Sequence, residues 1–117
     1  MKLSRTNLTL GLLAILASIL VACGTPTLKV TLIASDIEWN ITTINAKVGQ
    51  PIEITVTNAG ALDHDLVIEE LGVDILLSPG DTEVITVTPD HAGTFAYICS
   101  IPGHEEAGMV GEIVVAQ

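Results

Sequence analysis

Apolar and polar residues alternate with a period of two along most of the chain after residue 24, which is typical of half-buried strands. No window in that part has a sustained apolar period of 3.6 residues, so we expect little helix. Turns rich in Gly, Pro, Asn and Asp separate the runs. Seven or eight short strands at regular spacing predict an all-β, Greek-key β-sandwich. The runs are 28–33, 37–44 (irregular), 52–57, 64–68, 72–77 (an edge strand or a loop), 83–88, 94–98 and 110–116.

The first 22 residues have a different pattern. Lys2 and Arg5 precede an almost unbroken apolar run over 8–22, which is typical of a secretory signal. The run is shorter than the roughly 20 residues needed to span a bilayer. It ends in Leu20-Val21-Ala22-Cys23, which resembles the bacterial lipobox, where the Cys is acylated and becomes the mature N-terminus. The alternative is ordinary cleavage near Ala22, which releases a soluble protein.

This pattern predicts three segments. Residues 1–22 are a lipoprotein signal peptide, 23–30 a lipid-anchored N-terminus with a short spacer, and 31–117 the folded domain. We therefore expect an exported protein anchored by lipid to a bacterial membrane, facing the periplasm or the cell exterior. The mature part has two lysines against all 14 acids, a side-chain charge of −12. Such a charge repels nucleic acid and suits a cationic partner.

The second cysteine of the chain needs a separate explanation. With Cys23 acylated, Cys99 has no disulfide partner, although exported proteins meet an oxidising compartment. Metal ligation would account for it. Cys99-x4-His104-x4-Met109 lies between two strand-like runs, and His64 begins an earlier run. Two His, one Cys and a weak Met ligand are the ligands of a blue copper electron-transfer centre.

Strand parity supports a buried metal at this loop. Cys99 has the parity of Phe95 and Tyr97, so the thiol points the same way as two core aromatics. Met109 likewise has the parity of the apolar residues of the last run. Taken singly, a Cys or Met in such a place usually fills a core. Their joint spacing instead favours a ligand hairpin, which would hold the ligands in place in both oxidation states of copper.

These residues resemble the cupredoxin family, which includes plastocyanins, azurins, auracyanins and related small blue copper proteins. The likeness runs from about Asp36 to the C-terminus and includes the Asn58-Ala59-Gly60 turn, the strand over 93–99, and Gly108-Met109-Val110-Gly111. The Cys-x4-His spacing is azurin-like and the His-x4-Met spacing is plastocyanin-like. The resemblance implies that 31–117 is a cupredoxin-like domain holding one type 1 copper ion. The implied metal ligands are His64, Cys99, His104 and Met109.

One residue departs from the family pattern. The family usually has Asn after the first His, where its side chain ties the two ligand loops together, and this chain has Asp65. The backbone N–H of residue 65 could still donate to the Cys99 sulfur. An added carboxylate is expected to lower the reduction potential, and the value itself is left open.

Three functions compete for this pattern. The first is a membrane-tethered one-electron carrier, and the alternative is a copper-binding chaperone or storage module. Chaperones usually favour exposed, exchangeable sites, whereas these ligands come from strand ends. A catalytic copper domain fails on residue inventory, because a trinuclear cluster needs several more His than His91 and a binuclear centre needs two loop Cys. We therefore expect no enzyme activity.

The resemblance also implies where a redox partner binds. In the family the C-terminal His ligand reaches the surface through an apolar patch, and His104 has that position here. Glu105 and Glu106 follow it, so we expect a monomer whose partner docks with a positively charged rim. We expect His91 in an exposed turn and Trp39 in the core or at a strand edge. The expected patch residues are Ala61, Leu62, Ile101 and Pro102.

Overall fold

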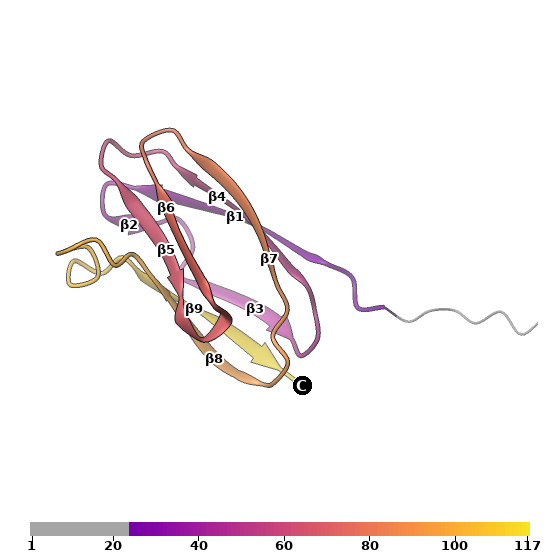
Figure 1. Cartoon of the computed structure of the whole chain (residues 1–117). Coiled ribbons are helices and arrows are strands. Elements are labelled where there is room, and N and C mark those ends of the chain that lie inside the picture. Colours follow the sequence, from indigo (N-terminus) through magenta and orange to yellow (C-terminus); the bar gives the residue numbers. More distant parts are fainter. Residues whose placement is uncertain (1–23) are drawn as a thin grey trace, which may run out of the picture.

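The computed structural model describes residues 24–117, which form nine strands and one short 3₁₀ turn (Figure 1). The predicted signal peptide and Cys23 lie outside these residues. Within 24–117, no helix has the length and apolar character needed to cross a membrane. The elements are β1 (Leu28–Ser35), β2 (Glu38–Trp39), β3 (Thr43–Lys47), β4 (Ile52–Asn58), β5 (His64–Ile68), η1 (Glu69–Leu71), β6 (Val73–Leu77), β7 (Thr82–Val87), β8 (Gly93–Ile98) and β9 (Val110–Ala116).

The strands form two sheets that pack face to face. One has the order β2-β1-β4-β7 and the other β3-β9-β8-β5-β6. β1 pairs in parallel with β4, and β3 in parallel with β9, while the remaining pairs are antiparallel. The predicted all-β sandwich is confirmed. The strand count is nine because the two-residue β2 forms as well.

The core lies between the sheets and follows the alternation of the sequence. In β4 every second residue is buried, from Ile52 to Asn58, and the residues between them are half-buried. Phe95 and Tyr97 of β8 are also buried, with Cys99 directly after them. Tyr97 packs edge-on against Trp39, with ring centroids 6.1 Å apart, and its hydroxyl donates to the carbonyl of Ile41. The core therefore continues directly into the predicted ligand loop.

The irregular run over 37–44 divides between the two sheets. Asp36 and Ile37 have positive φ angles of 36° and 71°, which close a tight turn between β1 and β2. Such angles are uncommon for residues other than Gly, Asn and Asp, so alternation alone does not predict this turn. The chain then crosses to the other sheet as β3. Trp39 is both buried and on an edge strand.

The two ends of the sandwich differ. At one end, which we call the ligand end, lie the segments 59–63 and 99–109. At the opposite end the chain enters β1, where Leu28 N–H donates to Pro51. The turn over 48–50 lies there too, with Val48 N–H donating to Ala116 and Gly49 N–H to Pro89. Both described termini are therefore remote from the ligand end (Figure 1).

Candidate metal centre

The loop between β8 and β9 holds three of the four predicted ligands through its own backbone. The N–H of Cys99 donates to the carbonyl of Met109 over 3.1 Å, and the N–H of Met109 donates to that of His104 over 3.0 Å. The N–H of His104 donates to Ile101 over 2.9 Å. Gly103 has a φ of 87°, a left-handed conformation that glycine adopts without steric cost directly before His104. The loop is therefore closed around its ligands by short-range hydrogen bonds.

His64 comes from a separate strand and is positioned by Asn58. The side-chain amide of Asn58 donates to the carbonyls of Leu62 and Leu77, over 2.7 and 2.8 Å. Its oxygen accepts from the N–H of Gly60 over 2.9 Å. A Cβ on residue 60 would lie 3.3 Å from Nε2 of His64, so glycine lets this segment pass close behind the ring.

The structural role of Asn58 was not predicted from the sequence. This residue is wholly buried, and its hydrogen bonds to Gly60 and Leu62 hold the segment before His64. The sequence does contain a signal for this role, because Asn58 has the parity of the buried residues of β4. A polar side chain at such a position must find buried hydrogen-bond partners.

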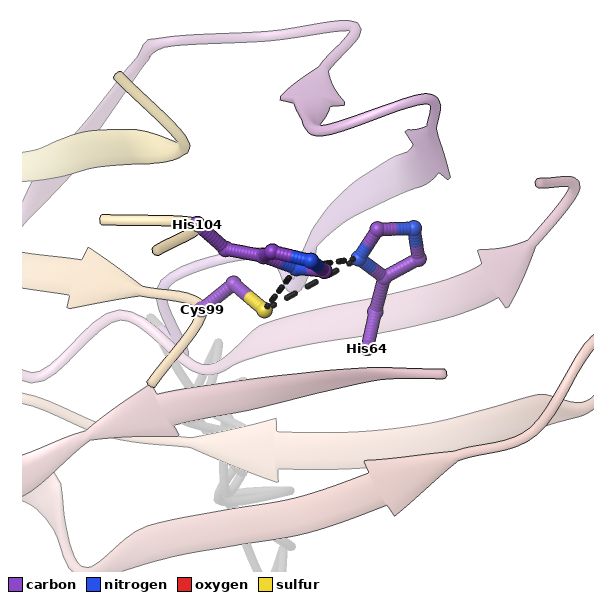
Figure 2. Close-up of side chains that lie close together, drawn as sticks. All are labelled: His64, Cys99 and His104. Atoms are coloured by element: carbon purple, nitrogen blue, oxygen red, sulfur yellow. Dashed lines mark hydrogen bonds between the residues drawn. The ribbon is translucent and has the colours of Figure 1, made fainter. Parts of the chain in front are cut away.

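The imidazoles of His64 and His104 turn their Nδ1 atoms toward the Cys99 sulfur (Figure 2). The two Nδ1 atoms are 3.2 Å apart. The Cys99 sulfur lies 3.8 Å from Nδ1 of His64 and 3.4 Å from Nδ1 of His104. The point equidistant from these three atoms lies about 2.0 Å from each, close to the bond lengths of metal–imidazole and metal–thiolate ligands. The three donors therefore fit one metal ion.

The fourth residue lies in the same buried end. Met109 is wholly buried, and its backbone is hydrogen-bonded to the backbones of both Cys99 and His104. His64 and Cys99 are also wholly buried, whereas His104 retains 7% of its surface. His64, Cys99, His104 and Met109 form a cluster typical of a type 1 copper site. The donor set of two imidazoles, a thiol and a thioether suits copper better than the oxygen-preferring cations.

Burial sets the protonation of the metal-free ligands. It raises the pKa of the Cys99 thiol, an effect partly opposed by N–H groups directed at the sulfur, including that of Asp65 at 3.5 Å. Burial, and then the neighbouring His104, lower the pKa of His64, which keeps this imidazole neutral and able to ligate. A metal ion must therefore displace the thiol proton, because the thiolate is the ligand.

Asp65 ties the two ligand segments together. One carboxylate oxygen accepts from the backbone N–H of Ser100, and the other accepts from the Ser100 hydroxyl, each over 2.5 Å. Asp65 has the opposite parity from the buried His64, Leu66 and Ile68 of β5, yet it is only 7% exposed because its side chain is hydrogen-bonded to Ser100. The backbone N–H of Asp65 also reaches the Cys99 sulfur, as expected.

The remaining predicted residues are placed as follows. His91 lies at the opposite end, exposed, with Nδ1 2.6 Å from a carboxylate oxygen of Asp90 and the ring stacked at a tilt on Phe95. It is therefore not part of the cluster. Cys23, the predicted lipidation site, stays a prediction because it lies outside the described residues.

Comparison with known proteins places the fold in a family. Residues 7–115 match the family described as the cupredoxin-like domain. The chain belongs to this family. Among curated relatives, the copper-resistant cuproprotein CopI of Rubrivivax gelatinosus is 28% identical over 93 residues, covering 62% of this chain and 56% of that protein. The nitrous-oxide reductase of Pseudomonas fluorescens is 32% identical over 81 residues, covering 66% of this chain and 13% of that enzyme. Both matches span less than two thirds of the relative.

Solved structures show the same fold. The auracyanin of Roseiflexus castenholzii superposes with a TM-score of 0.69 at 22% identity, covering 79% of this chain and 99% of that one. Auracyanin A of Chloroflexus aurantiacus gives a TM-score of 0.64 at 21% identity, covering 77% and 98%. The copper nitrite reductase of Nitrosomonas europaea gives 0.65 at 24% identity, covering 77% of this chain and 41% of that enzyme. The cupredoxin-like sandwich expected from the sequence is confirmed.

Proposed function

We propose that this protein is a one-electron carrier that holds a single type 1 copper ion. The observation that carries this proposal is the convergence of His64, Cys99 and His104, with their donor atoms all within 4.8 Å of one another and buried. Ligands held by strand ends and by a hydrogen-bonded loop change little between oxidation states, and a small rearrangement favours fast electron transfer. Copper, when bound, supplies the redox couple, while the chain holds the ligands, excludes water and directs the Asp65 N–H to the sulfur.

A second candidate is a copper-binding chaperone or storage module, and the relative named as a copper-resistant cuproprotein favours it. Burial argues against it, because a chaperone must release its ion to an acceptor. The two roles separate in one experiment on the copper-loaded protein. A carrier shows an intense visible absorption band and reversible one-electron voltammetry, and retains its copper against a competing chelator. Rapid copper loss to the chelator without a reversible couple would favour the chaperone.

We also propose that the protein catalyses no reaction of its own. Two of the three His of the chain lie in the cluster, and the third, His91, lies exposed at the opposite end. The likeness to nitrous-oxide reductase and nitrite reductase covers only a minor part of each enzyme. Absence of nitrite and nitrous oxide turnover by the copper-loaded protein, with an intact couple, is the expected result.

For its location, we propose a bacterial lipoprotein acylated at Cys23, facing the periplasm or the cell exterior. The exposed residues 24–27 enter the sandwich at the opposite end, and β1 then runs through eight residues toward the ligand end. At a rise of about 3.3 Å per residue, β1 alone separates the two ends by roughly 25 Å. The ligand end of a tethered molecule is therefore free to face away from the membrane.

Mass spectrometry of the native N-terminus tests the anchor. We expect an acylated Cys23, and a soluble or unprocessed protein for Cys23→Ala. An unmodified residue following Ala22 would contradict acylation and leave the proposed carrier role untouched.

We further propose that a redox partner docks on the ligand end over His104. This ligand is the least buried of the four. Around it lie exposed Leu62, at 48%, with exposed Ala61 and Pro102 and half-buried Ile101. Glu105 and Glu106 are exposed beside it, which suits a partner with an apolar centre and a positively charged rim. We expect the carrier itself to be a monomer.

A further inference from the structure

Among residues 24–117, Ser100 alone donates hydrogen bonds to the buried carboxylate of Asp65. Its oxygens accept from the N–H and the hydroxyl of Ser100, each over 2.5 Å, and the residue is 7% exposed. Both bonds have the carboxylate as acceptor, which is the role of the ionised form. Its backbone N–H at the same time reaches the Cys99 sulfur over 3.5 Å. The negative group is therefore held at the residue that directly follows Cys99.

Within residues 24–117 no lysine or arginine pairs with this carboxylate. The two lysines of that range are elsewhere: Lys29 pairs with Glu53 over 3.5 Å, and Lys47 ends β3 at the opposite end. A buried charge without an opposite charge is costly. Among residues 24–117, the group of side chains that could hold a metal ion is the cluster of His64, Cys99 and His104, which flanks Asp65 in the sequence and through Ser100.

We propose that the Asp65 carboxylate is the countercharge of the metal centre, and that it makes the centre electrically neutral with Cu(II) and therefore favours the oxidised state. This inference rests on the proposed copper site. Cu(II) has two positive charges, the Cys99 thiolate cancels one and the Asp65 carboxylate cancels the other. With copper bound, reduction by one electron from a partner, which is itself oxidised, would convert Cu(II) to Cu(I) and leave the buried centre with a net charge of −1. An asparagine at this position would leave the reduced centre neutral instead.

The test is Asp65→Asn, which keeps the shape and an oxygen acceptor for the Ser100 N–H while removing the charge. We expect this variant to bind Cu(II) roughly tenfold or more weakly, because a unit charge a few ångströms away acts strongly in a buried site. Its affinity for Cu(I) should change less. Each tenfold change in the ratio of the two affinities raises the reduction potential by about 59 mV.

Asp63→Asn is the matched control. It removes the same charge two residues away, but Asp63 is exposed, so water and salt screen its effect. We expect a smaller potential shift that shrinks further at high ionic strength, whereas the shift of Asp65→Asn should persist. Equal shifts for the two variants would overturn the proposal.

Ser100→Ala separates charge from geometry. It removes the hydroxyl donor and keeps both the carboxylate and the backbone N–H donor. If it raises the potential as much as Asp65→Asn does, the effect comes from the tie between the segments and the proposal is wrong. Thermal unfolding is the readout that does not depend on the couple: Cu(II) should stabilise Asp65→Asn less than it stabilises the unchanged protein.

Should Asp65→Asn fail to fold, Asp65→Ser replaces it as a second neutral variant with the same expectations. If the copper-loaded protein without any substitution shows no intense visible band, the copper site itself is contradicted.

Discussion

The two ends of the sandwich hold the same kinds of side chain in opposite surroundings. At the ligand end, His64 and His104 are buried, and Asp65 is held by Ser100. At the opposite end, His91 and Asp90 are exposed and hydrogen-bonded to one another. An imidazole next to a carboxylate is therefore no site by itself. Burial, which removes competing water, and the convergence of a thiol and a second imidazole distinguish the ligand end.

The largest expected effect is loss of the copper site at the ligand end with the fold retained. Cys99→Ser should abolish the intense visible absorption of the copper-loaded protein, because thiolate-to-copper charge transfer produces it. Far-UV circular dichroism should still show a mostly β protein, since the hydroxyl is close in size to the thiol. Blue colour retained in this variant would contradict the assignment of the centre.

The next effect tests how dry the core is beneath the ligand end. Burial, and then the Glu112 carboxylate, raise the pKa of Tyr97 from 10.0 to about 12, roughly a hundredfold in proton affinity. Tyr97 is the single tyrosine of the chain, so an alkaline absorbance titration reports on it alone. We expect little tyrosinate at pH 11 in the folded protein and about nine-tenths in urea.

The same shift has a consequence for stability. The folded state holds the Tyr97 proton more tightly than the unfolded state does. The contribution of the protonated Tyr97 to the free energy of unfolding is therefore fully present below pH 10 and is lost as pH rises toward 12. Half-ionisation of Tyr97 near pH 10 in the folded protein would show that water reaches the hydroxyl.

A smaller effect is expected from a substitution that keeps the copper site and changes its reduction potential. Met109→Gln should keep the visible band and lower the reduction potential, because an amide oxygen favours the oxidised ion more than a thioether does. We expect a roughly tenfold change in the ratio of the two copper affinities, or about 59 mV, by voltammetry. An unchanged potential would show that Met109 is only a core residue.

The surface of the ligand end should affect the rate of electron transfer and leave the potential nearly unchanged. In Glu105→Gln/Glu106→Gln, stopped-flow electron transfer to a cationic partner should slow several-fold at low salt and converge with the unchanged protein at high salt. Glu83→Gln on β7, an exposed strand of the other sheet, is the control for the loss of one exposed charge. If neither the rate nor its dependence on ionic strength changes, the docking surface lies elsewhere.

The smallest effect is expected at the opposite end. The hydrogen bond to His91 lowers the pKa of Asp90, and His91→Gln should let it rise toward its ordinary value, measurable by NMR titration. The visible band, the potential and the unfolding free energy should all be nearly unchanged, because water screens an exposed pair. Any change of the copper spectrum would mean that the two ends are coupled.

Much of this molecule follows from local sequence. Alternation at β4 and β8 predicts which side chains are buried, because successive residues of a strand face opposite sides. Cys99, His104 and Met109 lie within eleven residues of one another, so one hairpin loop suffices to hold them together, and their spacing was enough to predict a copper site. The positive φ angles of Asp36 and Ile37, and the crossing to β3 that follows, had no such local signal.

Only the tertiary structure decides what lies opposite that loop. His64 is 35 residues from Cys99, and it comes within 3.8 Å of the sulfur because β5 pairs beside β8. The same packing places Ser100 against Asp65, and so buries a residue whose parity on β5 is opposite to that of the core residues. Sequence alternation states which way a side chain points along its own strand, but burial and electrostatic partners depend on segments that are distant in the chain, and those are set only when the sheets pack.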